Sequence, residues 1–125
     1  PVDFHNTEVA FRVKSDGGRF PCDVVYFKTS ESEGEVYHPT QKPVALGRYL
    51  IRTFTSPGGV VVDNACGSGS FLVAAVLENR NFIGIELNQV VLLHKSRPVN
   101  LVEIARKRIR VAQKEAAALL PAFRS

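Results

Sequence analysis

A short run of small residues, Asp63–Phe71 (DNACGSGSF), has the composition of a ligand-binding loop. It follows an apolar run with the character of a strand, and an apolar helical pattern follows it. Such a loop leaves backbone N–H groups free, and the N-terminus of the next helix adds partial positive charge. Gly67 and Gly69 have no side chain to hold a ligand away from the backbone. Because ligands of open α/β sheets bind at the carboxyl ends of strands, the loop predicts a site for an anionic or nucleotide-like ligand.

Three classes of ligand compete for this loop. A phosphate-binding P-loop is excluded, because Ser70 and Phe71 stand where it needs lysine followed by serine or threonine. A dinucleotide site wants a third glycine, and Leu72 in that place weakens this alternative without excluding it. S-adenosylmethionine has no phosphate, and it needs N–H donors, an acid near its aminoacyl end and a second acid for its ribose. Asp63 and Glu86 suit these two needs, but a NAD site uses the same acid as Glu86, so both ligands stay open.

The elements that must position these residues follow from hydrophobic pattern and turn signals. Val60–Asp63 is an apolar run ending in an acid, as in a parallel strand covered on both faces. Ser70–Glu78 predicts a helix, and its small Ala74 and Ala75 permit close packing on a sheet. Asn81–Leu87 predicts the next strand. The order strand, loop, helix, strand is typical of an α/β fold with a parallel sheet.

Further elements flank this unit. Asp23–Thr29 is rich in β-forming residues and predicts a strand. Pro43 suits the first turn of a helix, where its missing N–H costs nothing. The apolar face of that helix consists of Val44, Gly47, Leu50, Ile51 and Phe54. Residues 88–100 (NQVVLLHKSRPVN) are expected to be irregular, and no role is assigned to residues 90–99 within them. A longer helix is predicted from Leu101 until Pro121 ends it.

The composition is that of one domain, residues 1–125, or of part of a larger one. The sequence contains no methionine, so either an initiator was removed before Pro1 or the chain was cut from a longer protein. The net charge of +4 is compatible with a nucleic-acid partner and equally with an ordinary soluble protein. No segment reaches the apolar length of a membrane span. Cys22 and Cys66 form neither a metal cluster nor a disulfide framework, so no metal site and a cytoplasmic location are expected.

A hexapeptide, HPTQKP at His38–Pro43, precedes the helix that leads into the glycine strand. Together with DNACGSGSF and with GIEL at Gly84–Leu87, it resembles the DNA amino-methyltransferases, which methylate N6 of adenine or N4 of cytosine. The resemblance spans roughly residues 23–109. It implies an α/β, Rossmann-like methyltransferase fold with a partial sheet and helices on both faces. It also implies S-adenosylmethionine as cofactor and double-stranded DNA as partner.

The resemblance also implies roles for particular residues. Lys42 is expected to pair with the cofactor carboxylate, and His38 and Thr40 to order the loop or bond the same group. Glu86 is expected on the ribose hydroxyls. The residues implied to bind the cofactor are His38, Pro39, Thr40, Gln41, Lys42, Asp63, Ala65, Gly67, Ser68, Gly69, Ser70, Glu86 and Leu87.

The chain departs from the family pattern in two ways. Asn64 and Ala65 replace the proline and the aromatic residue that usually follow the acid of the glycine motif. The lost aromatic contact predicts weaker cofactor binding. The catalytic tetrapeptide, (Asp/Asn/Ser)-Pro-Pro-(Tyr/Phe/Trp), is absent, because the sequence contains no Pro-Pro. In the family this tetrapeptide holds the target amine and stacks on the flipped base, so no catalytic residue is assigned in this chain.

The order of the motifs matches one branch of the family, in which the tetrapeptide and the DNA-reading region come first. The chain is therefore expected to be the C-terminal, cofactor-binding part of a DNA methyltransferase, completed by an upstream segment or a second chain. Alone, it is expected to bind the cofactor weakly and to transfer no methyl group. Two alternatives are a non-catalytic module that completes another chain and a NAD-type dehydrogenase domain, which the hexapeptide disfavours.

A basic run, RKRIR, begins at Arg106. It is either a solvated helix face or a DNA contact through Arg106, Lys107 and Arg110. Arg108 lies on the other side of the same helical turn, and we expect it to face inward toward a carboxylate.

Overall fold

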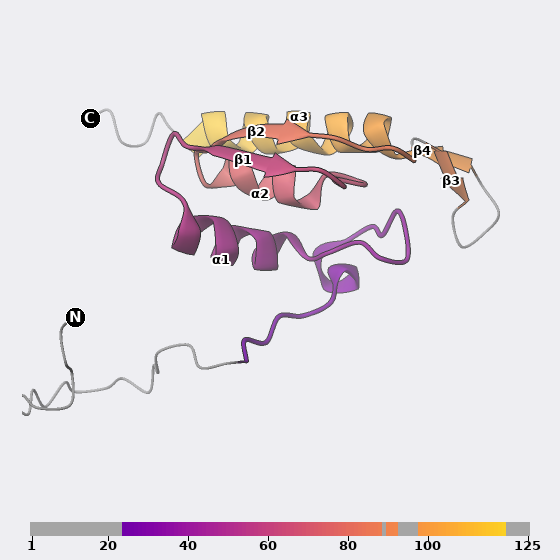
Figure 1. Ribbon diagram of the computed structural model, residues 1–125, viewed down its shortest axis with the longest axis horizontal. Helices are drawn as coiled ribbons and strands as arrows, with labels where there is room; N and C mark the ends of the chain where they lie inside the picture. Colours follow the sequence, from indigo (N-terminus) through magenta and orange to yellow (C-terminus); the bar gives the residue numbers. More distant parts are fainter. Residues whose placement is uncertain (1–23, 89, 93–97, 120–125) are drawn as a thin grey trace, which may run out of the picture.

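The computed structural model describes residues 24–88, 90–92 and 98–119. In Figure 1, three helices lie stacked beside a pair of parallel strands, and a small hairpin precedes the last helix. The elements in chain order are η1 (Ser30–Glu33), α1 (Val44–Phe54), β1 (Val60–Asp63), α2 (Ser70–Leu77), β2 (Asn81–Gly84), β3 (Val90–Leu92), β4 (Pro98–Asn100) and α3 (Leu101–Leu119).

The predicted strand–loop–helix–strand unit is confirmed. β1 and β2 pair in parallel, with Val60 opposite Asn81 and Asp63 opposite Gly84, and α2 connects them. β2 is shorter than predicted, because only the four residues that pair with β1 form the strand. Beyond it, the N–H of Ile85 still donates to the Asp63 carbonyl at 2.9 Å. The paired strands therefore end together beside the glycine loop.

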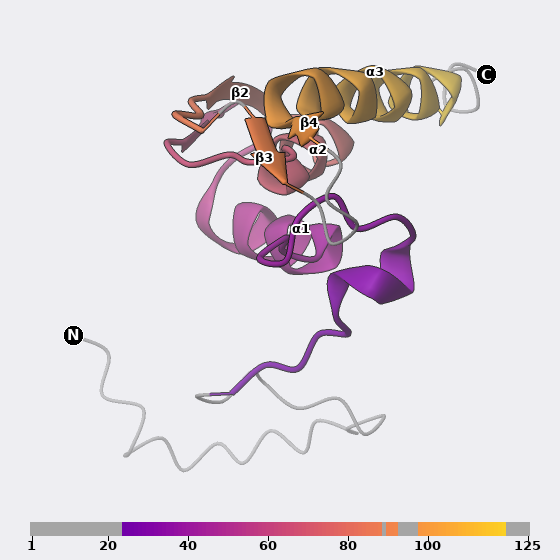
Figure 2. The same ribbon diagram turned by 90° about the vertical axis from the view of Figure 1, so that its right-hand side faces the viewer.

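Helix α2 lies at the centre of the molecule and packs against α1, α3 and both strands (Figure 2). Its Ala74 and Ala75 are completely buried, as the close packing predicted from their size requires. On the α1 side, Gly47 allows the approach, because a Cβ there would lie 2.4 Å from the Phe71 ring. Small residues thus let the helices pack around the element that carries the loop.

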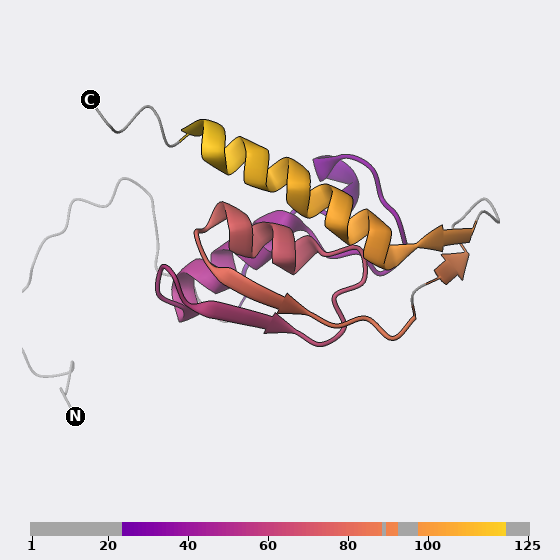
Figure 3. The ribbon, with the colours of Figure 1, turned by 90° about the horizontal axis from the view of Figure 1, so that it is seen from above.

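The sheet is covered on one face only in the described part of the chain. Figure 3 shows the three helices on the same side of β1 and β2. On the other side, Val60, Val62, Ile83 and Ile85 are each more than half exposed. Strand β1 was expected to be covered on both faces, and the sheet was expected to carry helices on both. Within the described residues, helices cover one face and leave an apolar face open.

Pro43, expected within the first turn, lies one residue before helix α1, and the helix buries only part of its predicted apolar face. Gly47 and Ile51 of the predicted apolar face are buried, whereas Phe54 on the same face is 77% exposed. The helices run side by side, with Gly47 at Phe71 and Arg52 at Glu78. Phe54 therefore lies past the end of α2, where no partner covers it.

The N-terminus of α1 is held by an acid from another element. Pro43 is the N-cap, one residue before the helix, and has no side chain that could cap it. Glu33 of η1 accepts hydrogen bonds from the N–H groups of Val44, at 2.6 Å, and Ala45, at 2.8 Å. This contact satisfies two free donors of the first turn and holds the intervening hexapeptide segment as a closed loop.

Two predictions outside this unit were wrong. Residues 24–29 form no strand, because the described residues offer no neighbouring strand to receive their hydrogen bonds. Phe27 packs on Tyr49 of α1 instead, with ring centroids 5.6 Å apart. Residues 88–100, expected to be irregular, contain β3 and β4, which pair antiparallel. Helix α3 begins at Leu101, as predicted, whereas its predicted end at Pro121 lies outside the described residues.

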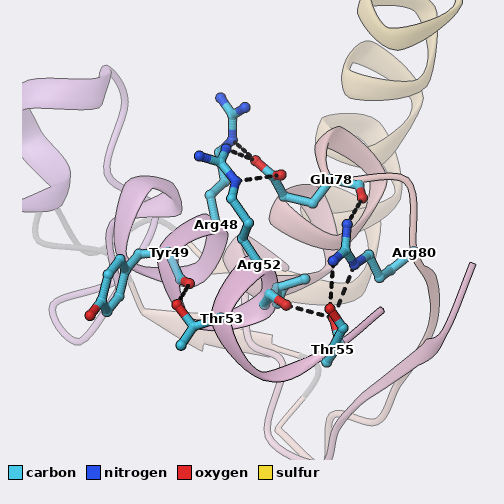
Figure 4. A network of polar contacts seen from close by, with 8 residues as sticks. Arg48, Tyr49, Arg52, Thr53, Thr55, Glu78 and Arg80 are labelled. Atoms are coloured by element: carbon cyan, nitrogen blue, oxygen red, sulfur yellow. Dashed lines mark hydrogen bonds and ion pairs between the residues drawn. The ribbon is translucent and has the colours of Figure 1, made fainter. Parts of the chain in front are cut away.

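A charged cluster joins α1 to the end of α2 (Figure 4). Glu78 accepts from Arg48 Nε at 2.6 Å and from Arg52 at 2.5 and 3.0 Å. Arg80 turns toward Thr55, where it donates to the hydroxyl at 3.0 Å and to the carbonyl at 2.6 Å. Hydrogen bonds from Arg52, then from Arg48, lower the pKa of Glu78 from 4.5 to about 2, against the opposing effect of its burial.

Replacing Glu78 with glutamine is expected to lower the free energy of unfolding at neutral pH by about 1–2 kcal/mol, because two ion pairs are lost. The loss stays this small because both arginine side chains are exposed to solvent. The pKa of Glu78 is lower in the folded chain than in the unfolded one. Its contribution is therefore complete above pH 4.5 and is lost as the pH falls toward about 2. Urea titrations at pH 7 and pH 3 measure this. The difference between wild type and variant should shrink at pH 3, and Glu115→Gln, on an exposed site of α3, should show no such change.

Candidate functional site

The glycine loop has the backbone that its sequence predicts. Gly67 and Gly69 have φ of +51° and +79°, in the left-handed region that favours glycine. Asp63 accepts a hydrogen bond from the N–H of Ala65 at 3.2 Å, so this acid orders the start of the loop. Gly69 is the N-cap of α2, and its N–H donates to the Cys66 carbonyl at 2.7 Å. The loop is thus a tight turn from strand to helix.

The second acid lies at the same loop. Glu86 accepts a hydrogen bond from the N–H of Gly67 at 2.7 Å and another from the N–H of Asn88 at 2.8 Å. Its carboxylate therefore sits where the parallel strands end, and each oxygen keeps a free lone pair. The neighbouring Leu87 is 89% exposed.

The hexapeptide loop meets the glycine loop through a buried hydroxyl. Ser68, 1% exposed, donates to Gln41 Oε1 at 3.0 Å, and its Oγ lies 3.2 Å from His38 Nε2. The other ring nitrogen of His38 lies 3.2 Å from the Thr40 hydroxyl. Burial lowers the pKa of His38, although Glu86 opposes this, so the neutral ring dominates at neutral pH.

A cavity of about 270 Å³ opens between the two loops. Cys66, not among the predicted residues, is one of its lining residues, and burial raises the pKa of its thiol and keeps it protonated. The lining residues are His38, Thr40, Lys42, Asp63, Ala65, Cys66, Gly67, Ser68, Ser70 and Phe71. Eight of the thirteen residues expected to bind the cofactor are in that set.

The other five expected residues lie around this cavity rather than on it. Glu86 stands on the far side of Gly67, where it lines a smaller space between β2 and α3. Gly69 faces α3, since a Cβ there would lie 2.8 Å from that of Ala105. Pro39 and Gln41 line a different hollow beside residues 25–31, and Leu87 points into solvent.

A larger cavity of about 550 Å³ lies between α3 and residues 30–44. Its walls are apolar side chains of α2 and α3 with a mixed rim of charges, and no backbone of the glycine loop reaches it. Size alone therefore does not select it as the site. The smaller cavity has the two loops whose sequence predicted the chemistry.

Sequence reasoning missed the part played by α3. Arg108 turns inward, as expected, but it contacts no carboxylate of the residues that the structure describes. Its Nη1 donates to the Ser68 carbonyl at 2.8 Å and to the hydroxyls of Ser68 and Ser70 at 3.0 and 3.2 Å. Its guanidinium carbon lies 5.7 Å from the centre of the Tyr37 ring. The only sign in the sequence was an arginine on an otherwise apolar helix face.

Two other classes of site find no support in the described ranges. There, no group of three or more histidine, cysteine, aspartate or glutamate side chains could hold a metal ion. No helix among the same residues has both the length and the apolar character needed to cross a membrane. The exposed Arg106, Lys107 and Arg110 stay a prediction for DNA contact.

Comparison with known proteins identifies the family. A family model described as DNA methylase, for the N6 and N4 methyltransferases, matches residues 10–93. The chain belongs to this DNA methylase family. The resemblance carried by the hexapeptide, the glycine loop and the acid of the second strand is therefore confirmed at the level of the family.

Three relatives illustrate the match. The chain is 48% identical over 65 residues to YubD of Escherichia coli (strain K12), a methylase by name, which covers 52% of the chain and 27% of YubD. It is 45% identical over 51 residues to the DNA adenine methyltransferase YhdJ of the same strain, covering 41% of the chain and 17% of YhdJ. It is 47% identical over 60 residues to the type II methyltransferase M.HindIII of Haemophilus influenzae (strain ATCC 51907 / DSM 11121 / KW20 / Rd), covering 48% of the chain and 19% of M.HindIII.

A solved structure confirms the fold. The crystal structure of the M1.HpyAVI–SAM complex aligns with a TM-score of 0.51 and 30% identity, covering 73% of this chain and 42% of that one. The α/β, Rossmann-like methyltransferase fold expected for this DNA methylase is therefore observed. The matched part of the chain corresponds to about a quarter or less of each curated relative.

Proposed function

We propose that this chain is the S-adenosylmethionine-binding part of a DNA methyltransferase that acts on the exocyclic amine of adenine (N6) or cytosine (N4). The observation that carries the proposal is the cavity at which the hexapeptide and the glycine loop meet, joined by Ser68 and His38. The related structure of M1.HpyAVI is a complex with SAM. YhdJ is a DNA adenine methyltransferase and M.HindIII is a type II methyltransferase, which supports DNA as the substrate.

The residues at the cavity fit the chemistry of this cofactor. The ammonium of Lys42 suits the cofactor carboxylate, and Asp63 suits its amino group. At about 270 Å³ the cavity lies just below the usual size of ligand sites, roughly 300–1,000 Å³, so it suits one end of the molecule. Glu86, beyond Gly67, has free lone pairs for the ribose hydroxyls at the other end. When bound, the cofactor supplies a methyl group on a sulfonium, and these residues orient it.

Calorimetry with S-adenosylhomocysteine on the purified, folded chain tests cofactor binding. We expect weak binding, because Ala65 lacks the aromatic surface that the family pattern has at this place. A thermal shift with S-adenosylhomocysteine and none with NAD would separate this function from that of a dehydrogenase domain. A folded sample that gives no heat of binding with S-adenosylhomocysteine would overturn the proposal.

The chain needs a second part for methyl transfer. It has no Pro-Pro tetrapeptide to hold a target amine, so the chain by itself is expected to transfer no radiolabelled methyl to DNA. The apolar face formed by Val60, Val62, Ile83 and Ile85 suits the packing of an upstream segment or a second chain that carries the tetrapeptide. Methyl transfer by the chain alone would contradict this division of labour. A non-catalytic module that completes another chain stays the alternative.

The basic residues of α3 are proposed to contact DNA phosphates. Reversing the charge of Arg106, Lys107 and Arg110 with glutamate is expected to weaken binding to double-stranded DNA by about tenfold or more at low salt. The wild-type affinity should fall steeply as salt rises, and that of the variant less so. Fluorescence anisotropy with a labelled duplex measures both. Lys28→Glu, at an exposed position away from α3, is the control, and an unchanged affinity in the triple variant would dispose of the contact.

We propose a cytoplasmic location with this function, because the DNA of a bacterium such as Escherichia coli, the source of YhdJ, lies in the cytoplasm. The free thiol of Cys66 suits the reducing conditions of that compartment.

A further inference from the structure

Arg108 is a half-buried charge without a carboxylate partner among the described residues. Its guanidinium contacts three oxygens of the glycine loop and the face of Tyr37. Burial lowers the pKa of Arg108, although an arginine stays charged at neutral pH. Removing such a group from water is unfavourable unless its hydrogen bonds offset the loss. The three bonds to the loop provide that offset.

All three hydrogen bonds come from one nitrogen and end on residues that surround Gly69. Ser68 and Ser70 flank that glycine, which turns the chain from the loop into α2. The bond to the Ser68 carbonyl fixes the orientation of the peptide that follows it. The bonds to the two hydroxyls fix the side chains, and both serines line the cavity. Arg108 itself does not line that cavity, so it acts from behind the loop.

The same contact reaches the hexapeptide. The Ser68 hydroxyl accepts from Arg108 and donates to Gln41, and His38 lies at hydrogen-bond distance from it. Gln41 in turn accepts from the N–H of Tyr37 at 3.0 Å, and the Tyr37 ring lies over the guanidinium. A closed circuit of contacts therefore links α3, the glycine loop and the hexapeptide through one buried hydroxyl.

We propose that Arg108 is a positioning residue that fixes the glycine loop, and through Ser68 the hexapeptide, in the geometry that binds the cofactor. This inference rests on the proposed function only for the identity of the ligand. Arg108 contacts the glycine loop directly and the hexapeptide through Ser68. Loss of its guanidinium should therefore loosen both loops that line the cavity.

The test compares Arg108→Met, Arg108→Lys and Lys114→Met by calorimetry with S-adenosylhomocysteine. Arg108→Met is expected to lower the affinity by about tenfold or more, because hydrogen bonds from a charged donor are lost. Arg108→Lys keeps a charged donor but lacks the planar guanidinium that lies against the Tyr37 ring, so it should lose less affinity than Arg108→Met and more than Lys114→Met. Lys114→Met, an exposed site on the same helix, should bind as wild type does. Equal affinity for Arg108→Met and wild type would overturn the inference.

Amide hydrogen exchange provides a readout that does not depend on the ligand. Without ligand, residues 66–70 should exchange faster in Arg108→Met than in Lys114→Met, whereas α1 should be unchanged. If the wild-type chain does not bind S-adenosylhomocysteine, the proposed function is wrong, but amide hydrogen exchange still decides the role of Arg108. Uniformly faster exchange across all helices would indicate a purely structural role and would also overturn it. If Arg108→Met does not fold, Arg108→Gln, which keeps a neutral donor, is measured in the same two assays and should show the same losses relative to Arg108→Lys.

Discussion

Replacing Gly69 with alanine is expected to lower the free energy of unfolding by roughly 2–4 kcal/mol, from left-handed strain and overpacking together. Its φ of +79° disfavours any side chain, and a Cβ would lie 2.8 Å from the Cβ and 3.2 Å from the Cα of Ala105. The obstacle includes backbone, so no rotation of a side chain relieves it. Helix α3 must move away from the loop, which would also pull Arg108 from Ser68.

Gly58→Ala is a matched control for this substitution. Gly58 has nearly the same φ, +78°, but a Cβ there would meet nothing within 4 Å. Its substitution is therefore expected to cost only the backbone strain, roughly 1–2 kcal/mol. Urea denaturation of both variants gives the difference, which isolates the contact between the loop and α3. Equal losses in the two variants would show that α3 does not press on the glycine loop.

Replacing Glu86 with glutamine is expected to lower the affinity for S-adenosylhomocysteine by about 10- to 100-fold, from the loss of charged acceptors for the ribose hydroxyls. The fold should survive, because the amide oxygen can still accept from the N–H of Gly67, as the carboxylate does at 2.7 Å. The second contact, to the N–H of Asn88, is lost and should shift the melting temperature only slightly. Calorimetry and a melting curve on the same sample separate binding from folding.

Glu103→Gln serves as the control for charge, because Glu103 is exposed on α3. The affinity of Glu103→Gln for S-adenosylhomocysteine should equal that of wild type. If Glu86→Gln binds as tightly as Glu103→Gln, then Glu86 serves only to order the loop through Gly67. The ribose contact would then have to be sought elsewhere.

Much of the local structure could be predicted because it depends on neighbours in the chain. The apolar run at Val60–Asp63, the glycines after it and the helical pattern from Ser70 each indicate their own conformation. Asp63 bonds within the loop that it begins, so its role in ordering the turn needs no distant partner. The position of Glu86 at the end of the next strand also follows, since parallel strands end at one edge.

The errors have a common cause, which is that each depended on contacts that the composition of the segment itself does not reveal. Residues 24–29 have the composition of a strand, but no strand of the described part of the chain lies beside them. Phe54 has the helical spacing of a core residue but lies past the end of α2. Residues 90–92 and 98–100 pair only because the chain returns on itself, which periodicity does not reveal.

The sequence by itself determined the family, the kind of loop and most of the residues at the cavity, since these are properties of short motifs. Only the tertiary structure decided that Glu33 caps α1, that Glu78 gathers Arg48 and Arg52, and that Arg108 holds the glycine loop. The physical reason is that a long charged side chain can reach several partners with equal ease. Which partner it meets is set by the packing of the helices that carry it, and that packing is decided by small residues such as Gly47, Gly69 and Ala74.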